Sequence, residues 1–362
     1  MSTSPGKALI MAGGTGGHVV PALSLARALQ AKGVEIHWLG TPRGIENTLV
    51  PEAGIPLHHV SIVGLRGNGT LGWLKAPWRL WKAIRQARRI IQSLDVSLVV
   101  GLGGFASGPG GLAAWLMKVP LIIHEQNALP GMTNKVLARL ARRVYAAFPN
   151  AFDDARHPVV IGNPVRQEIA AIGEAPREIE ALTARPLRLL VVGGSLGAQV
   201  LNERVPAALA LMTADARPEV RHQAGRNKEA ATIEAYETAG VEANVSDFIG
   251  DMARAYEWAD LVVCRSGALT VTELAAAGRA SLLVPFPHAV DDHQTINANY
   301  LVEAGAAQLI PQAKMSVQAL SDTLGELLEA HRLLEMGRRA RSVAQLEATD
   351  IMAQGCMETG FE

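Results

Sequence analysis

Short apolar runs alternate with helix-like stretches along the whole chain, and this alternation constrains the fold more than any other feature of the sequence. Apolar runs without polar alternation are typical of parallel strands that are buried on both faces. Strands that alternate with helices predict βαβ units in a doubly wound parallel α/β sheet. The runs are "ALIM", "VEIHWLG", "VSLVVGLGG" and "VPLIIHEQN" in the first half, and "LRLLVVGGS", "DLVVCRSG" and "ASLLVPFP" in the second.

A glycine-rich turn between a strand and a helix occurs once in each half. In "IMAGGTGGHVVPALSLARAL" four glycines surround Thr15, His18 follows, and the pattern predicts a helix that starts at Pro21. In "LRLLVVGGSLGAQVLNERV" the same order returns around Ser195. Glycine lets backbone N–H groups approach a ligand closely, and a helix N-terminus attracts anions. Each turn therefore predicts a site for a dinucleotide, a sugar nucleotide or a diphosphate.

The duplicated turn and the length of 362 residues predict two Rossmann-like domains. Between them lies a segment rich in proline, glycine and charge, residues 162–186, which we interpret as a linker with a connecting helix. In such folds ligands bind where the carboxyl ends of the strands face a crevice. We therefore expect a binding cleft between the two domains.

The composition excludes several classes of protein. A hydrophobic fraction of 49% with 19% charged residues is typical of a globular protein. The formal net charge is zero, so attraction to an anion must come from local patterns, and we expect no nucleic-acid partner. Cys264 and Cys356 cannot make a disulfide framework, no signal-peptide pattern opens the sequence, and no apolar run is long enough for a bilayer. These features predict a cytoplasmic protein.

A nicotinamide dehydrogenase is the obvious rival for the first glycine turn. That fingerprint needs a third small residue at position 19, where Val19 stands, and an acidic residue at the end of the second strand, where Gly40 stands. Hydride transfer is therefore disfavoured. Neither "HEQN" nor the stretch with Asp291, Asp292 and His293 has the spacing of a metal site, so we expect no metal.

Two further motifs leave alternatives open. The glycines and Ser107 of "GLGGFASGPGG" provide backbone donors for phosphate oxygens, or they form a loop that packs against the first turn. In "CRSGALTVTELAAAG", Thr270 and Glu273 form a capping box, which the sequence alone slightly favours, or Glu273 accepts hydrogen bonds from a ribose on a nucleotide cradle. Cys264 is expected to be a small buried side chain and not a nucleophile.

The stretch "TLGWLKAPWRLWKAIRQARRIIQ" predicts a helix that lies on an anionic membrane surface. No acidic residue occurs between Glu52 and Asp95. With Pro77 as the first helical position, the expected core stripe is Leu80, Ile84, Ala87 and Ile91. Each cation near an anionic leaflet contributes about 1 kcal/mol, and tryptophan favours the interface, so we prefer a membrane to a protein partner. The expected contact residues are Leu74, Trp78, Trp81, Lys82, Arg85, Arg88, Arg89 and Trp115.

Several motifs in one order make the chain resemble the MurG-type family of bacterial peptidoglycan synthesis over essentially its whole length. The family transfers N-acetylglucosamine to undecaprenyl-diphospho-muramoylpentapeptide, and so acts in cell-wall biogenesis, cell shape and cell division. The motifs are "MAGGTGGHVVPALSLA", "GLGGFASGPGG", "HEQNALPGMTNK", "GNPVR", "VVGGSLGA", "DMARAYEWADLVVCRSGALTVTE" and "DDHQTINA".

The resemblance implies a GT-B fold and a reaction. Residues 1–163 would be the acceptor and membrane domain, residues 164–342 the UDP-N-acetylglucosamine domain, and a C-terminal helix of about 343–362 would pack back on the first. The sugar would move, with inversion, to the C4 hydroxyl of the N-acetylmuramoyl unit of lipid I and give lipid II and UDP. The enzyme would be peripheral on the cytoplasmic side of the inner membrane, without a cofactor, among partners in cell-wall assembly.

The resemblance also implies roles for single residues. His18 and Glu125 are the family's candidates for the general base, and we favour His18 because a histidine ordinarily titrates near pH 6.5. The donor would contact Thr15, Gly16, Gly17, Asn127, Arg166, Ser195, Ile249, Ala268, Leu269, Thr270, Val271, Thr272, Glu273 and Gln294. The acceptor diphosphate would bind Gly13, Gly14, Gly103, Gly104 and Ser107.

Two other functions use a similar fold. A UDP-sugar 2-epimerase, or another UDP-sugar-dependent transferase, would share the donor site, but an epimerase has no use for a basic helix that carries tryptophan. A membrane adaptor that only binds nucleotide sugars would not need His18. A positioned base contributes about 10²- to 10⁴-fold to a rate, so loss of the His18 side chain separates an enzyme from an adaptor.

Overall fold

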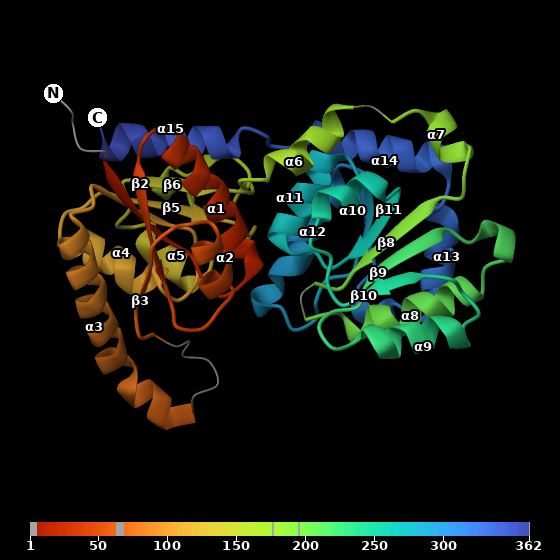
Figure 1. Ribbon diagram of the computed structural model, residues 1–362, viewed down its shortest axis with the longest axis horizontal. Helices are drawn as coiled ribbons and strands as arrows, with labels where there is room; N and C mark the ends of the chain where they lie inside the picture. Colours follow the sequence, from red (N-terminus) through yellow and green to blue (C-terminus); the bar gives the residue numbers. More distant parts are fainter. Residues whose placement is uncertain (1–5, 63–68, 176, 195, 362) are drawn as a thin grey trace. The chain divides into compact units, whose positions relative to one another are not determined.

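The computed structural model describes residues 6–62, 69–175, 177–194 and 196–361, with only the backbone described for 69–75 and Val290. The chain forms two compact units (Figure 1). The N-terminal domain comprises Met1–Val165 and Gln345–Glu362, and the C-terminal domain comprises Arg166–Ala344. Each boundary lies two residues beyond the one expected from the sequence.

The N-terminal domain is built on a seven-stranded sheet among the described residues, in the order β3-β2-β1-β4-β5-β6-β7. Neighbouring strands are parallel throughout, as the apolar runs predict. The strands are β1 (Lys7–Met11), β2 (Glu35–Gly40), β3 (Leu57–His59), β4 (Leu98–Gly101), β5 (Leu121–Glu125), β6 (Arg143–Ala146) and β7 (Val159–Val160).

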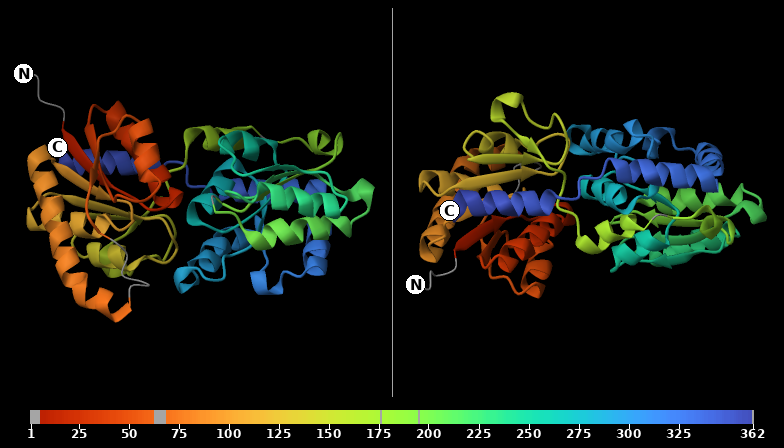
Figure 2. Two further views of the ribbon diagram at one scale, coloured as in Figure 1. Left: turned by 60° about the horizontal axis from the view of Figure 1, so that its bottom comes forward. Right: turned by 90° about the horizontal axis from the view of Figure 1, so that it is seen from above.

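Helices cover both faces of this sheet. Successive strand residues point to opposite sides, and in these strands both sets of side chains are apolar and need to be buried. Ile10 packs in a core with helices α1 and α15, whereas Leu9 packs in a second core with α3, α4 and α5. Figure 2 shows the long helix α3 beside α4. The helices are α1 (Gly16–Ala31), α2 (Glu46–Glu52), α3 (Gly69–Leu94), α4 (Ser107–Leu116), α5 (Met132–Leu137) and α15 (Ala348–Gly360).

The C-terminal domain repeats the plan with a six-stranded parallel sheet in the order β10-β9-β8-β11-β12-β13. Its strands are β8 (Arg188–Val192), β9 (Glu219–Gln223), β10 (Asn244–Ser246), β11 (Leu261–Cys264), β12 (Ala280–Leu283) and β13 (Ala307–Leu309). Cys264 is buried on β11, and burial raises the pKa of its thiol to about 12. The thiol is therefore a small core side chain, as expected.

Helices α8, α13 and α14 supply side chains to the core of this domain. Its helices are α6 (Gln167–Ala170), α7 (Ile179–Thr183), α8 (Gln199–Ala210), α9 (Glu229–Thr238), α10 (Met252–Trp258), α11 (Ala268–Ala277), α12 (His293–Glu303), α13 (Val317–Leu327) and α14 (Ala330–Ser342). The segment 162–186 does not contain the single connecting helix expected. It holds the short helices α6 and α7, because prolines and glycines interrupt it.

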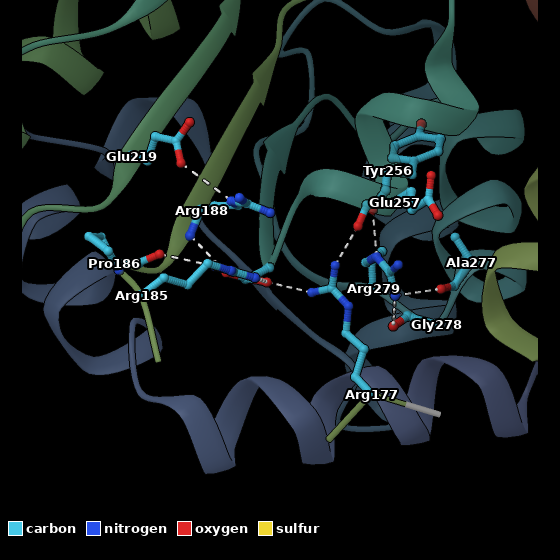
Figure 3. A network of polar contacts seen from close by, with 11 residues as sticks. Arg177, Arg185, Pro186, Arg188, Glu219, Tyr256, Glu257, Ala277, Gly278 and Arg279 are labelled. Atoms are coloured by element: carbon cyan, nitrogen blue, oxygen red, sulfur yellow. Dashed lines mark hydrogen bonds and ion pairs between the residues drawn. The ribbon is translucent and has the colours of Figure 1, made fainter. Parts of the chain in front are cut away.

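A buried carboxylate ties the chain before β8 to the start of β11 (Figure 3). Asp260 accepts a hydrogen bond from Arg185 at 2.7 Å and one from the backbone N–H of Arg188 at 2.8 Å, and Arg177 pairs with its other oxygen. Nearby, the buried guanidinium of Arg279 donates to the backbone carbonyl of Ala277 at the end of α11. These contacts join elements that no local sequence signal connects.

Two helices begin earlier than the prolines suggest. Helix α1 begins at Gly16 and contains Pro21, and α3 begins at Gly69 and contains Pro77, so both predicted helix starts are wrong. A proline inside a helix forgoes one backbone hydrogen bond to the preceding turn. In α1 that loss falls near the N-terminus, and the ring of Pro21 is buried in the core.

Candidate active site

The first glycine turn joins β1 to α1 at the carboxyl end of the strand. Gly14 has φ +91°, a conformation that favours glycine, and Thr15 precedes the first helical residue without capping through its side chain. The first N–H groups of a helix have no intrahelical acceptor, and in α1 these include Gly16 and Gly17. The helix start therefore presents donors for an anion, as the sequence predicts.

A buried carboxylate that the sequence analysis missed accepts a hydrogen bond from this turn. Glu46 lies at the start of α2 and is fully buried. It accepts hydrogen bonds from the N–H of Gly14 at 2.9 Å and from the N–H of Thr41 at 3.2 Å. A Cβ at Gly13 would lie 2.6 Å from its carboxylate, and one at Gly44 would be closer still. The carboxylate thus fills a space that only glycines leave open.

The second glycine cluster packs against the first turn, which is the alternative that the sequence left open beside phosphate binding. A Cβ on Gly104 would lie 2.5 Å from the carbonyl oxygen of Gly13, so the two backbones touch. Ser107 is buried, and its hydroxyl lies within hydrogen-bond distance of the carbonyls of Met11 and Gly103. Among the predicted acceptor-diphosphate residues, the N–H of Gly14 and the hydroxyl of Ser107 are already engaged within the protein.

His18 lies in the first turn of α1 and is held by a buried amide. Its Nδ1 is 3.1 Å from Oε1 of Gln126, and the amide nitrogen of Gln126 donates to the carbonyl of Leu102. A Cβ on Gly103 would lie 2.7 Å from Nδ1, so the imidazole lies over a residue without a side chain. The structure therefore brings the ends of β1, β4 and β5 together around one imidazole.

Glu125, the other candidate base, is buried at the end of β5 and is fully engaged. One oxygen accepts from the N–H and the side-chain amide of Asn127, at 3.0 and 3.2 Å. The other accepts from the N–H of Gly131 at 3.1 Å and from Asn134 at 2.9 Å. A carboxylate with these donors shapes the loop that follows β5.

In the C-terminal domain, Arg166 and Glu273 form an ion pair at 2.8 Å. Tyr256, which the sequence analysis missed, donates to the other oxygen of Glu273 at 3.3 Å. Burial raises the pKa of Glu273, and the charge of Arg166 offsets part of that rise. Burial also raises the pKa of the Tyr256 hydroxyl, and neighbouring Glu273 adds to it. Both carboxylate oxygens of Glu273 therefore have donors in this structure.

The capping box expected at the start of α11 does not form. The helix starts after Gly267, whose φ and ψ are extended, and the side chain of Glu273 turns to Arg166 instead. Leu269 and Thr270 are half-buried, and the rest of the predicted cradle is buried: Ala268, Val271, Thr272 and Glu273. Thr272 donates to helical carbonyls. At the start of α11, the backbone and the half-buried Leu269 and Thr270 are therefore accessible to a nucleotide, whereas Glu273 is held by Arg166 and Tyr256.

Three predicted donor residues of the C-terminal domain remain: Ile249, Gln294 and Ser195. Ile249 is half-buried in the loop before α10. The amide oxygen of Gln294, at the start of α12, accepts from the N–H of Phe286 at 2.9 Å. Ser195 lies outside the described residues.

A cavity of about 580 Å³ lies within the C-terminal domain. Arg166 and Ile172 line it together with the start of α10, where Gly250, Asp251 and Arg254 contribute. Arg166 therefore reaches an open space while it pairs with Glu273.

The tryptophans and cations of α3 that the sequence predicts at a membrane lie on its exposed face. Trp78 and Trp81 are 64% and 45% exposed, their rings stack at 4.9 Å, and Arg85 lies over the Trp81 ring at 4.6 Å. Leu80, expected in the core, is 38% exposed, and Ala83 takes its place because the buried stripe begins one turn later. The side chains of the other predicted contacts, Lys82, Arg88, Arg89 and Trp115, are exposed, and that of Leu74 lies outside the described residues.

No group of three or more histidine, cysteine, aspartate or glutamate side chains within residues 6–62, 69–175, 177–194 and 196–361 is arranged to hold a metal ion. In the same part of the chain, no helix combines the length and the apolarity that a membrane span requires.

Two family models match the chain in the order of its domains. The model of the glycosyltransferase family 28 N-terminal domain matches residues 8–146, and that of the family 28 C-terminal domain matches residues 188–354. The chain belongs to glycosyltransferase family 28. As in that family, its two Rossmann-like domains with parallel sheets form a GT-B fold, and it is a glycosyltransferase.

Close relatives of this family 28 transferase share its whole length. A protein of Chromohalobacter salexigens is 65% identical over 352 residues, which cover 97% of this chain and 96% of the relative. A protein of Pseudomonas syringae pv. tomato is 55% identical over 97% of this chain and 98% of its own length. Both are named UDP-N-acetylglucosamine--N-acetylmuramyl-(pentapeptide) pyrophosphoryl-undecaprenol N-acetylglucosamine transferase. These names do not favour the 2-epimerase alternative.

A solved structure agrees with these relatives. The crystal structure of MurG from Acinetobacter baumannii is 42% identical, with a TM-score of 0.82, and the match covers 98% of this chain and all of that one. The resemblance to the MurG-type family that the motifs indicate is therefore confirmed. Three side chains that contact predicted site residues were not themselves predicted: Glu46 and Gln126 in the N-terminal domain and Tyr256 in the C-terminal domain. Only Gln126, next to the recognised "HE", carried a local signal.

Proposed function

We propose that this chain transfers N-acetylglucosamine from UDP-N-acetylglucosamine to the C4 hydroxyl of undecaprenyl-diphospho-N-acetylmuramoyl-pentapeptide, lipid I, to give lipid II and UDP. The support is a relative of 65% identity over nearly the whole chain whose name states this transfer. The site contributes the chemistry: an imidazole at a helix start in the N-terminal domain, and an arginine beside an open cavity in the C-terminal domain.

In this reaction His18 acts as the general base. The C4 hydroxyl oxygen attacks the anomeric carbon of the donor sugar, its proton passes to the imidazole, and the bond from that carbon to the UDP oxygen breaks. UDP leaves and the configuration inverts. The observation that carries this assignment is the contact of Nδ1 with Gln126, because it holds the ring while Nε2 makes no hydrogen bond to the described part of the chain. Glu125 serves as the anchor of the loop after β5.

Arg166 and Glu273 bind the donor by exchanging partners. A diphosphate competes with the Glu273 carboxylate for the Arg166 guanidinium, because charge-assisted bonds to phosphate are strong and bidentate. Glu273 then has an oxygen available for ribose hydroxyl donors, while Tyr256 holds the other. A helix N-terminus contributes about 0.3 to 2 kcal/mol to an anion, so the arginine is the larger contributor to diphosphate binding.

The remaining assignments complete the proposal. Gly16 and Gly17, which follow Thr15, offer N–H groups to an anionic substrate, and Asn127, which follows β5, orients the donor sugar. Helix α3 places the protein on the inner face of the cytoplasmic membrane, where the lipid acceptor resides, through its stacked tryptophans and its arginines.

The test is transfer of labelled N-acetylglucosamine from its UDP donor to a lipid-linked muramoyl-pentapeptide. The wild type gives product, and His18→Ala lowers kcat about 10²- to 10⁴-fold. UDP affinity, measured by calorimetry, stays unchanged because His18 does not hold the nucleotide. A wild type that binds UDP-N-acetylglucosamine but forms no product contradicts the transfer. A His18→Ala protein with full activity contradicts the role of His18.

A further inference from the structure

Gln126 is a buried amide whose orientation is fixed from both sides. It follows β5 and is 2% exposed. Its side-chain nitrogen donates to the carbonyl of Leu102, so its oxygen must face His18, 3.1 Å from Nδ1. Its backbone carbonyl accepts from the side-chain nitrogen of Asn163 at 3.2 Å. The amide therefore cannot turn without loss of a buried hydrogen bond.

This orientation determines where the proton of a neutral His18 lies. An amide oxygen has no hydrogen to donate, so the contact is a hydrogen bond only if Nδ1 carries the proton. The neutral imidazole then has its lone pair on Nε2. A Cβ at position 103 would lie 2.7 Å from Nδ1, so only a glycine there leaves room for the imidazole.

We propose that Gln126 is a positioning residue that keeps His18 in the Nδ1–H tautomer, with the Nε2 lone pair directed to the acceptor hydroxyl. The inference rests on the proposed role of His18 as the base. Gln126 touches no substrate; it acts through the imidazole.

An amide suits this role better than a carboxylate because it orients the ring without adding charge. A carboxylate at 126 would stabilise the imidazolium, which has no lone pair to accept a proton. The other ionisable groups around the ring do not replace Gln126. His124 is buried with its pKa lowered to about 4 by burial, and its Nε2 contacts the carbonyl of Gly162. The carboxylates of Glu125 and Glu46 already accept hydrogen bonds from other donors, which include the backbone N–H of Gly131 and that of Gly14.

The first measurement needs no variant. Long-range ¹H–¹⁵N NMR of the imidazoles of the wild-type protein, with the His18 signals assigned by their loss in His18→Ala, distinguishes a protonated ring nitrogen from one with a lone pair. Above the pH at which His18 is protonated, we expect Nδ1 to carry the proton and Nε2 to show the shift of a bare nitrogen. A proton on Nε2 overturns the proposal whatever the activity of the enzyme.

The second measurement is the pH profile of kcat/KM for Gln126→Glu. A carboxylate within hydrogen-bond distance stabilises the imidazolium, so the acid limb moves up by about 1 to 3 pH units. In a His18→Ala background the same substitution has no further effect on the limb. The matched control is Gln30→Glu, which adds the same charge at an exposed position of α1 and leaves the limb in place.

The outcomes separate this inference from the proposed function. A lower kcat for Gln126→Glu at every pH, with an unmoved limb, means that Gln126 is merely structural and contradicts the proposal. A fully active His18→Ala protein contradicts the role of His18 as the general base. The tautomer of His18 in the wild type is then still decided by NMR. If Gln126→Glu does not fold, the wild-type NMR result alone decides.

Discussion

At the scale of single residues, Glu46 is the side chain on which the first glycine turn most depends. Glu46→Ala leaves the buried N–H of Thr41 without an acceptor, at a cost of about 1 to 3 kcal/mol, and it leaves the more exposed N–H of Gly14 to water. We expect the free energy of unfolding of the N-terminal domain to fall by roughly 1 to 3 kcal/mol, the cost of the one buried donor. Urea unfolding followed by hydrogen exchange of β1 and β2 measures it.

The control for Glu46 lies at the other end of the same helix. Glu52 is exposed, so Glu52→Ala removes a carboxylate from α2 without removing a buried acceptor, and we expect a change within about 0.5 kcal/mol. Equal losses for the two variants would show that the carboxylate at 46 does not support the turn.

The residues that the sequence did not reveal have partners far along the chain. Glu46 contacts Gly14 across 32 positions, and Gln126 contacts His18 across 108. Neither position follows a spacing rule, since the contacts arise only when β1, β2, β4 and β5 align in the sheet. By contrast, His18 and Glu273 stood in short motifs next to a strand end, where sequence reasoning is strongest.

At the scale of elements, the strands were predictable and the helix starts were not. A strand buried on both faces must be an apolar run, and the runs at β1, β2, β4, β5, β8, β11 and β12 all form strands. Helix starts depend on a weaker local preference. Pro21 and Pro77 suit a first turn but lie inside α1 and α3. In α1 the buried ring of Pro21 packs in the core and offsets one lost hydrogen bond, whereas Pro77 is exposed.

Helix α3 carries a prediction of its own about membranes. We expect the protein to bind vesicles that contain phosphatidylglycerol and to bind pure phosphatidylcholine vesicles weakly. Arg88 and Arg89 are exposed, and each contributes about 1 kcal/mol near an anionic surface. Replacing both by alanine should weaken binding roughly 30-fold in a flotation or sedimentation assay. Trp78→Ala with Trp81→Ala should weaken binding to both kinds of vesicle.

The matched control for α3 removes the same charge from the other domain. Arg332 and Arg339 have exposed side chains on α14, and their replacement by alanine should leave vesicle binding unchanged. An equal loss for both double variants would mean that binding follows net charge and not the α3 face.

At the scale of the whole molecule, two cores imply two units of stability. Each domain has its own sheet and its own set of helices, so chains of this kind need not unfold in one step. The Asp260 network lies entirely in the C-terminal domain. Asp260→Asn should therefore lower the stability of that domain by roughly 3 to 5 kcal/mol, because it leaves Arg177 and Arg185 without their carboxylate.

The effect of Asp260 should also depend on pH, in a direction that its environment sets. Burial alone would raise the pKa of this carboxyl, but the hydrogen bond from Arg185 and the charge of Arg177 outweigh it, so the pKa is lowered from 3.8. A lowered folded-state pKa means that the stabilisation is complete above the unfolded value and is lost as the pH falls below 3.8. The difference between wild type and Asp260→Asn should shrink over that range.

Hydrogen exchange resolved by peptide measures both predictions for Asp260 at once, because it reports each domain separately. Peptides of β8 and β11 should lose protection in Asp260→Asn at neutral pH, while peptides of β1 and β4 keep theirs. An exposed carboxylate of the same domain, Glu237→Gln on α9, is the control and should change neither set. A uniform loss of protection in both domains would show that they unfold together, and a difference that does not shrink as the pH falls below 3.8 would show that charge is not its source.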